Sequence, residues 1–365
     1  MQALVLLIAV QPMTRSILVS LLAPSLIAGC AGTPNVPFVT ERYVTVDNPT
    51  MNTDSVASWV PDSGTAWLFA TSKDQHLIEI FDASTGMHLR NLGGPGSGPA
   101  QFQRPNGILV LDDLLLIVER DNRRVQIFSL PALESIASFG DDDLIKPYGA
   151  WLQATSAGIY RLYVSDAYET EDERVPPPEE LDHRVHVFEF DVERARGEIT
   201  VTQARHTKAF GDTEGPGVLY VVESLWGDPA NDRLLIAEED PAGGRVIKPY
   251  SMAGRYTGPL IGEEIFRSQP EGIALYQCED GSGYWITTDQ NRRSNVFHLF
   301  DRQTLAHVGG FSGEVTRHTD GIWLNQDPLP GFPAGAFFAV HDDKAVGAFD
   351  WRDIAAALDI EPGCE

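Results

Sequence analysis

The chain has 365 residues, a hydrophobic content of 43% and a formal net charge of −25 at pH 7. This length and composition suit one large globular domain or two ordinary ones, and they argue against extended disorder. The negative charge excludes nucleic acid and anionic membrane surfaces as electrostatic partners, because both carry the same sign. An anionic substrate is disfavoured as well, unless cations intervene.

The first 30 residues are typical of a targeting segment rather than of a folded domain. Met13-Thr14-Arg15 gives a short positive start, and Ile17–Ile27 is an apolar run too short to span a bilayer comfortably. Ile27-Ala28-Gly29-Cys30 resembles a bacterial lipobox, which implies that Cys30 is lipidated and becomes the new N-terminus. The resemblance to bacterial lipoproteins implies, from Ala31 rather than Asp at the next position, an outer-membrane destination with the protein facing the periplasm or the cell surface. An ordinary cleaved signal with a chance cysteine is the alternative, and residues 31–37 form a tether in either case.

A repeated pair of strands organises the remainder of the chain. Six hydrophobic strands each end at a charged or polar cluster, and they are Trp67–Thr71, Leu114–Val118, Leu162–Ser165, Leu234–Ala237, Tyr284–Thr288 and Phe337–Val340. A second strand with an aromatic residue follows each of them, and the aromatic residues are Phe81, Phe128, Phe188, Tyr250, Phe300 and Phe349. Their spacing of 47 to 62 residues, with several short strands per unit, predicts a β-propeller.

Phe38–Val46 alternates in hydrophobicity and precedes the first repeat, whereas the sixth repeat has little strand signal after Phe349. Propellers commonly close by pairing an N-terminal strand into the last blade, which removes the open edge. We therefore predict an all-β fold, a six-bladed β-propeller over residues 38–365 that is closed by an N-terminal strand. Thr170–Asp182 is expected to be a solvated insertion, and Trp351–Leu358 a short helix.

Each repeat also begins alike, with a polar residue, a glycine and an apolar run. Arg104–Ile108, Lys146–Ala150, Gln269–Ile273 and His318–Ile322 share this pattern, and we assign Asp54–Ala57 and Gly215–Val218 to the same place in repeats one and four. Glycine permits tight backbone packing near the axis, so the polar residue before it is expected to face the central opening. These residues and the acidic strand ends together would line one site.

The three cysteines of the chain are Cys30, Cys278 and Cys364. With Cys30 used by the lipid anchor, Cys278 and Cys364 form an even pair in an oxidising compartment. They are either joined, which would tie the C-terminal tail to the fifth repeat, or two free buried thiols. The sequence leaves both possibilities open.

Several collinear motifs resemble those of the calcium-dependent β-propeller phytases over roughly residues 40 to 355. In the second half they are Leu235–Asp240, Pro270–Tyr276, Gly281–Tyr284, Asp301–Gln303, His318–Ile322 and Phe332–Val340. Ala132–Ser135 and Lys146–Gly149 extend the resemblance into the first half. Residues 96–105 and 122–128 instead look like an NHL repeat, a propeller repeat used for binding and by other hydrolases.

The resemblance implies a shallow acidic site at the mouth of the channel, where several Ca²⁺ ions bind two phosphate groups and activate water. It implies catalytic roles for Glu239, Glu271 and Asp320. It implies phosphate binding by Lys73, Tyr148 and Arg123, with Arg120 as the alternative to Arg123. It implies metal binding by Asp54, Glu223, Glu239, Glu271, Glu314 and Asp320. These acids also suit Ca²⁺ on chemical grounds, because Ca²⁺ takes about six to eight oxygen ligands in irregular geometry.

The chain departs from the family at several motifs. The family's Asp-Asp-Pro-Ala is here Asp54-Ser55-Val56-Ala57, and its Asn-Asn-x-Asp-x-Arg motif is replaced by Arg104–Ile108. A lysine expected near Asp166 is missing, and Gln269 stands where the family has an aspartate. Fewer acids mean fewer calcium ligands, and the lost lysine weakens phosphate attraction.

The function predicted from the sequence is calcium-dependent hydrolysis of phosphoric monoesters, phytate or a smaller phosphoester, by a lipid-anchored monomer. The alternatives are a non-catalytic propeller that binds a ligand or protein, and a metal-dependent esterase or lactonase on the same fold. For any single acid, a solvated blade terminus is the competing interpretation. Trp59, Trp151 and Trp323 are interpreted as core packing, and no Gly-x-Ser-x-Gly elbow or His-x-x-x-His zinc spacing is present.

Overall fold

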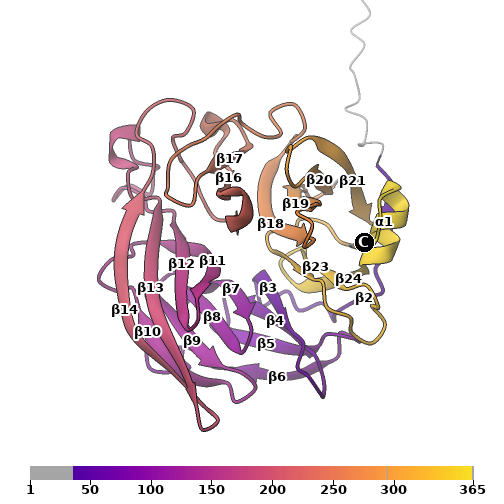
Figure 1. The fold of residues 1–365 in the computed structure, drawn as a ribbon, viewed down its shortest axis with the longest axis horizontal. Coiled ribbons are helices and arrows are strands. Elements are labelled where there is room, and N and C mark those ends of the chain that lie inside the picture. Colours follow the sequence, from indigo (N-terminus) through magenta and orange to yellow (C-terminus); the bar gives the residue numbers. More distant parts are fainter. Residues whose placement is uncertain (1–35, 294, 364–365) are drawn as a thin grey trace, which may run out of the picture. The chain divides into compact units, whose positions relative to one another are not determined.

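Six small sheets stand around a common axis in the computed structural model, which describes residues 36–293 and 295–363 (Figure 1). Each sheet, or blade, is built from consecutive antiparallel strands. The innermost strands contact one another in sequence, and the last of them contacts the first, so the ring is closed. The predicted six-bladed β-propeller is therefore confirmed.

The blades follow the chain in order. Blade 1 holds β3 (Thr53–Trp59), β4 (Trp67–Ser72), β5 (Leu77–Asp82) and β6 (His88–Leu92); blade 2 holds β7 (Pro105–Leu111), β8 (Leu114–Glu119), β9 (Arg124–Ser129) and β10 (Glu134–Phe139). Blade 3 holds β11 (Pro147–Ser156), β12 (Ile159–Asp166), β13 (Val185–Ala195) and β14 (Glu198–Phe210); blade 4 holds only β15 (Leu225–Asp228), β16 (Arg233–Glu238) and β17 (Val246–Tyr250). Blade 5 holds β18 (Gln269–Gln277), β19 (Gly283–Gln290), β20 (Val296–Asp301) and β21 (His307–Gly313); blade 6 holds β22 (Ile322–Asn325), β23 (Ala336–His341) and β24 (Ala345–Asp350).

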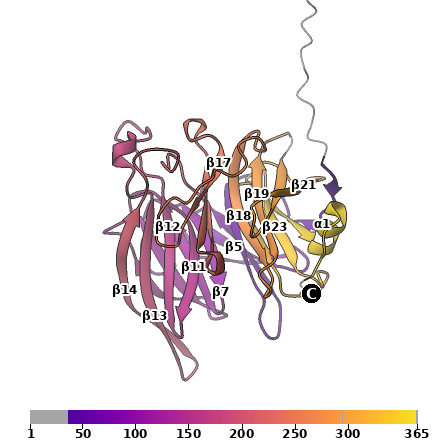
Figure 2. The same ribbon diagram turned by 45° about the horizontal axis from the view of Figure 1, so that its top comes forward.

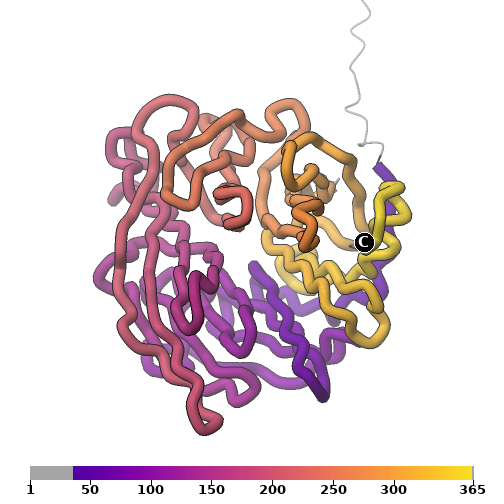
Figure 3. Tube along the Cα trace, in the orientation of Figure 1, coloured from indigo at the N-terminus to yellow at the C-terminus, as the bar shows by residue number. Residues whose placement is uncertain are grey.

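The N-terminal segment closes the ring by pairing with two blades. β2 (Tyr43–Val44) runs antiparallel to β24 as the outer strand of blade 6, which confirms the predicted closure. β1 (Phe38–Val39) runs parallel to β21 at the edge of blade 5. Figure 3 shows this indigo segment beside the yellow C-terminal strands and helix. Both sheet edges are thereby covered.

The six repeated aromatic residues all lie in the third strand of their blades and pack between neighbouring blades. None of them is more than 5% exposed. They are Phe81, Phe128, Phe188, Tyr250, Phe300 and Phe349. A β-strand that is buried on both faces reads as a nearly continuous apolar run, and β8, with all six residues buried, is an example.

Four of the acidic strand ends have a structural role that the sequence analysis did not predict. Each is buried at the last or the penultimate position of a second strand; these acids are Glu119, Asp166, Glu238 and Asp289. Asp166 accepts hydrogen bonds from the backbone N–H groups of Ile145 and Lys146, both at 2.7 Å. The carboxylates of Glu119, Glu238 and Asp289 likewise accept hydrogen bonds from backbone N–H groups of the loops that lead into their own blades. These four acids therefore do not form the expected ring of charge.

The other predicted elements are found, with one correction. The insertion after β12 contains a short 3₁₀ helix (Pro178–Glu180), and α1 spans Trp351–Leu358. Gly215–Val218 does not begin the innermost strand of blade 4, because a long loop intervenes and β15 starts at Leu225. Two further 3₁₀ turns are Pro229–Asn231 and Pro241–Gly243, and the β13–β14 hairpin extends past its neighbours (Figure 2).

Cys278 is disulfide-bonded, so the free-thiol alternative is excluded for it. The other two cysteines, together with the predicted lipobox and most of the tether, lie outside the described residues. None of the described helices is both long and apolar enough to cross a membrane.

Tyr43 links blade 6 to blade 1, and this link allows ring closure to be tested. Its hydroxyl donates to the backbone carbonyl of Ala83 at 2.7 Å, and its ring packs edge-on against Phe332. Tyr43→Ala should lower the free energy of unfolding by about 2 kcal/mol, measured by chemical denaturation. Val46→Ala, at a side chain that is 86% exposed, should stay within about 0.5 kcal/mol of wild type. Equal stabilities of the two variants would contradict the closure.

Candidate metal centre at the mouth of the channel

A β-bulge recurs at the start of the innermost strands. In β3, two residues, Asp54 and Ser55, lie opposite the single residue Thr71 of β4. The pairings of β7, β11 and β18 shift at the equivalent position. A bulge redirects the side chain of the extra residue, and here it turns that residue toward the axis.

The backbones of neighbouring blades come into contact at these bulges. The N–H of Gly149 donates to the carbonyl oxygen of Glu223 at 3.1 Å, and the N–H of Gly321 donates to that of Asp54 at 2.8 Å. A Cβ atom on Gly149 would lie 2.2 Å from the Glu223 oxygen, so only glycine allows this approach. Six equivalent residues are thereby placed around the axis: Asp54, Asn106, Tyr148, Glu223, Glu271 and Asp320.

Residues that follow the second strands add to this group. Glu239 comes directly after β16, Lys73 after β4, and Gln290 ends β19. Blade 4 has two adjacent acids at this place. Glu238 accepts a hydrogen bond from the loop backbone and pairs with Lys248, whereas Glu239 lies near the axis. Of two adjacent acids, one therefore supports the fold and the other reaches the site.

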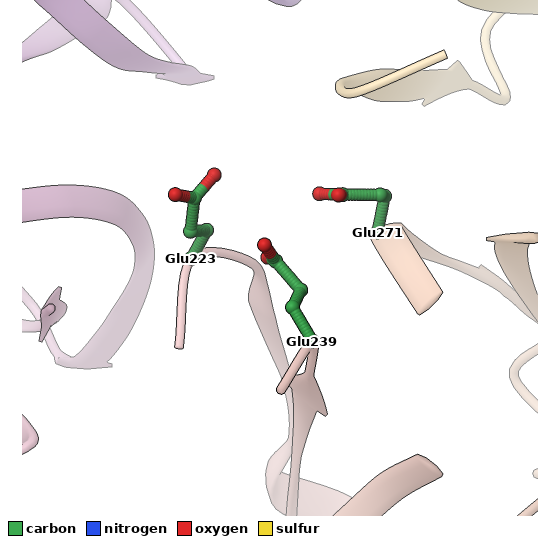
Figure 4. A group of neighbouring side chains, drawn as sticks. All are labelled: Glu223, Glu239 and Glu271. Carbon is green, nitrogen blue, oxygen red and sulfur yellow. The ribbon is translucent and has the colours of Figure 1, made fainter. Parts of the chain in front are cut away.

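Three carboxylates converge on one side of the mouth (Figure 4). One oxygen from each of Glu223, Glu239 and Glu271 lies within 4.8 Å of the other two. Glu239 and Glu271 are each only 5% exposed. Oε1 of Glu239 is buried and has no hydrogen-bond partner in the part of the chain that the structure describes. We call these three residues the glutamate triad.

The other side of the mouth is neutralised by a lysine. Nζ of Lys73 lies 2.6 Å from Oδ1 of Asp54 and 4.0 Å from Oδ2 of Asp320. The hydroxyl of Tyr148 donates to Asp54 at 3.4 Å, and the side-chain amide of Gln290 donates to Asp320. Within residues 36–293 and 295–363, no ion pair to lysine, arginine or histidine neutralises the glutamate triad.

Burial and crowding shift the titration of these groups. Burial, with the Asp54 carboxylate adding to it, raises the pKa of Glu223 to about 8. The pKa values of Glu239 and Glu271 lie well above their ordinary value, because burial and then the Glu223 carboxylate disfavour their charge. Burial opposes the charge of Lys73, but Asp54 and Asp320 outweigh it and the pKa of the ammonium is raised.

The glutamate triad fits a hard divalent cation. Carboxylate oxygens are ligands that Ca²⁺ prefers, and its irregular geometry tolerates donors from two loops and the strand β18. A cation would also partner the buried Glu239 oxygen and remove the repulsion that raises the pKa values. Glu223, Glu239 and Glu271 are thus the residues that would hold it, with Asp54 and Asp320 near by and engaged by Lys73.

Two residues proposed from the sequence lie away from this cluster. Arg123 lines an open hollow with Arg120, Lys146 and Glu169, to which no member of the glutamate triad contributes. Glu314 is exposed beyond β21, and its carboxylate accepts a hydrogen bond from Thr40 at 3.0 Å. The other seven site residues of the sequence analysis belong to the six axial positions or to the strand ends beside them.

A basic hollow beside the mouth was not predicted. It has a volume of about 630 Å³, and Glu239 contributes to its wall. Four arginines line it: Arg245, Arg267, Arg292 and Arg293. None of the four guanidinium groups forms an ion pair within the described part of the chain. Arg292-Arg293 after β19 is the one signal in the sequence, but only the fold brings it next to Glu239.

Comparisons with known proteins show no relative by sequence. No family model matches the chain, and no curated protein matches it. Among solved structures, Kuenenia stuttgartiensis hydrazine synthase aligns with 12% identity over 80% of this chain and 75% of that one, with a TM-score of 0.45. A chain of a nidogen/laminin complex aligns with 13% identity over 76% of this chain and 86% of that one, with a TM-score of 0.48. The described structure defines a six-bladed β-propeller with an acidic axial mouth.

The raised pKa values of the glutamate triad predict that the metal-free protein becomes less stable to unfolding as the pH rises. The triad carboxyls hold protons in the folded state above the pH at which unfolded glutamates lose them, so stability is lost as pH rises from about 5 to about 8. Thermal unfolding in a chelator should therefore show a falling melting temperature over this window. Glu223→Gln should flatten the slope. A melting temperature that rises over this window in the chelator would contradict the shared burial of the three acids.

Proposed function

We propose that this protein hydrolyses phosphoric monoesters with Ca²⁺ at the axial mouth. One observation carries the proposal: Glu239 belongs both to the glutamate triad and to the wall of the arginine-lined hollow. A site for a cation and a site for an anion would thus lie next to each other. A phosphoester and the metal ion that activates it must bind side by side in this way. The resemblance to the β-propeller phytases agrees with this chemistry.

Each group has a definable task. A bound Ca²⁺ would polarise a phosphoryl oxygen and lower the pKa of a coordinated water. Arg245, Arg267, Arg292 and Arg293 would orient the phosphate, because guanidinium groups bind phosphate oxygens with bidentate geometry. Lys73, which bridges Asp54 and Asp320, would keep these two acids positioned beside the cation. These arginines also answer the objection that a chain of net charge −25 repels an anion.

The ring has fewer acids than the phytase motifs supply. Asn106 occupies one of the six axial positions, and both polar atoms of its side chain are buried without a hydrogen-bond partner among the described residues. Fewer calcium ligands favour a smaller phosphoester over phytate as the substrate. The unpartnered amide of Asn106 also favours a second candidate function, because a bound ligand could satisfy it. In that case the propeller would bind a ligand at its mouth without catalysis.

Glu239 is the residue whose change tests catalysis most sharply. Glu239→Gln keeps the size of the side chain but removes a metal ligand, so phosphatase activity should fall by at least about 100-fold. The rise in melting temperature caused by millimolar Ca²⁺ in wild type should also shrink. Glu193→Gln, at an exposed site on β13, is the matched control. Calcium stabilisation without turnover of any phosphoester would favour the binding propeller, and turnover of a lactone alone would favour an esterase.

The two arginine sets can be distinguished kinetically. Arg292→Ala should raise KM for a phosphoester by about tenfold with little change in kcat, because it removes a phosphate contact rather than a metal ligand. Arg123→Ala, the residue suggested by the sequence resemblance, should leave both constants near wild type. The reverse pattern would move phosphate binding to the hollow beside Lys146.

We also propose that Cys30 anchors the protein to the bacterial outer membrane, with the propeller facing the periplasm or the cell surface as a monomer. Cys30→Ser removes the acylated residue, so the protein should leave the membrane fraction. Cell fractionation with immunodetection measures this. If the variant stays in the membrane fraction, the lipobox interpretation is wrong.

A further inference from the structure

A second hollow lies at the opposite end of the innermost strands. Its volume is about 820 Å³, and residues near the ends of β3, β7, β11, β15, β18 and β22 line it. The axial acids lie at the beginning of these strands, and the two sites share no residue. The phosphoester site therefore leaves this hollow without a function.

Tryptophan side chains form much of the apolar wall of this second hollow. Four of the seven tryptophans of the chain line it, from four different blades: Trp59, Trp151, Trp226 and Trp323. Trp226 and Trp323 meet edge to face with ring centroids 5.6 Å apart. Trp151 and Trp323 are 8% exposed, so the predicted core packing holds for most of their surface, and both also line the hollow. Indole rings attract cations through their electron-rich faces.

The charged groups around the hollow are all acidic. No lysine, arginine or histidine lines it, whereas Asp62, Asp112, Asp113 and Asp327 do. Asp113 forms an ion pair with Arg194 at 2.6 Å. Asp62 and Asp327 are exposed and form no ion pair within the described residues. An anionic ligand is therefore excluded here.

Side-chain oxygens without a hydrogen-bond partner among the described residues also line the hollow. Oε1 of Gln153 is buried and has no hydrogen-bond partner in the described chain, and the same holds for Oγ of Ser58, a residue that is 5% exposed. Asn325 and Gln326 each use one of their two amide N–H donors, on the backbone carbonyls of Asp327 and Gln277. A ligand that supplies donors suits these oxygens and the aspartate carboxylates of the rim.

We propose that this hollow binds an organic amine in its ammonium form. An ammonium group has three donors and no acceptor, which complements Gln153 and the rim carboxylates. Its aliphatic chain would lie against the indole rings, and its charge would be held between Asp62 and Asp327 or over an indole face. This site is independent of the phosphoester site, and it stands if that proposal fails.

Calorimetric titration of the full protein with 1,5-diaminopentane tests the proposal, with 1,5-pentanediol as the uncharged control of matched length. The diamine should bind saturably, and the diol at least about tenfold more weakly. Replacing Asp62 and Asp327 together by Asn should weaken diamine binding by about tenfold. Replacing Asp141 and Asp142 together by Asn, on the loop after β10, removes the same net charge and should have little effect. Equal binding of diol and diamine, or equal losses in the two double variants, would overturn the proposal.

The variant Glu239→Gln separates this site from the metal centre. It should leave diamine affinity unchanged, because Glu239 does not line the hollow. Loss of diamine binding in Glu239→Gln, or displacement of the diamine by Ca²⁺, would place the amine at the acidic mouth and refute the assignment. No diamine binding at millimolar concentration would refute it as well.

Discussion

Carboxylates meet at the axis because backbone, rather than side chains, fills the narrow end of the ring. Gly149 and Gly321 donate directly to the carbonyl groups of the neighbouring blades, and no Cβ fits there. Glu271 and Asp320 precede such glycines, whereas Glu223 supplies the carbonyl group that Gly149 contacts and Glu239 directly follows β16. Two ionised carboxylates about 5 Å apart repel by about 3 kcal/mol at an effective dielectric constant near 20, so the arrangement favours protonation or a bound cation.

The fold could be predicted because its signals repeat. A buried second strand such as Leu114–Val118 and a buried aromatic such as Phe128 recur six times, and repetition compensates for the weak signal of any one strand. Blade 4 was misplaced at Gly215–Val218 because its innermost strand has only four residues and follows a long loop. Pattern alone could not distinguish a glycine in a loop from a glycine at the axis.

The site was predicted less completely, for identifiable physical reasons. Glu271 and Asp320 could be found because each precedes a glycine at a repeated position. Glu238 and Glu239 look equivalent in the sequence, but one binds loop N–H groups and the other faces the axis. The four arginines of the basic hollow come from three loops of blades 4 and 5, so their convergence follows from the ring and not from local sequence.

Proton release on calcium binding tests the central claim most directly. Titration calorimetry near pH 7, in buffers with different ionisation enthalpies, counts the protons displaced per Ca²⁺. The pKa of Glu223 is raised to about 8 by its surroundings, so Ca²⁺ should displace about one proton or more from the triad near this pH. Glu223→Gln should reduce that number and weaken binding. Calcium binding without proton release, or binding unchanged in the variant, would show that the glutamate triad does not hold the ion.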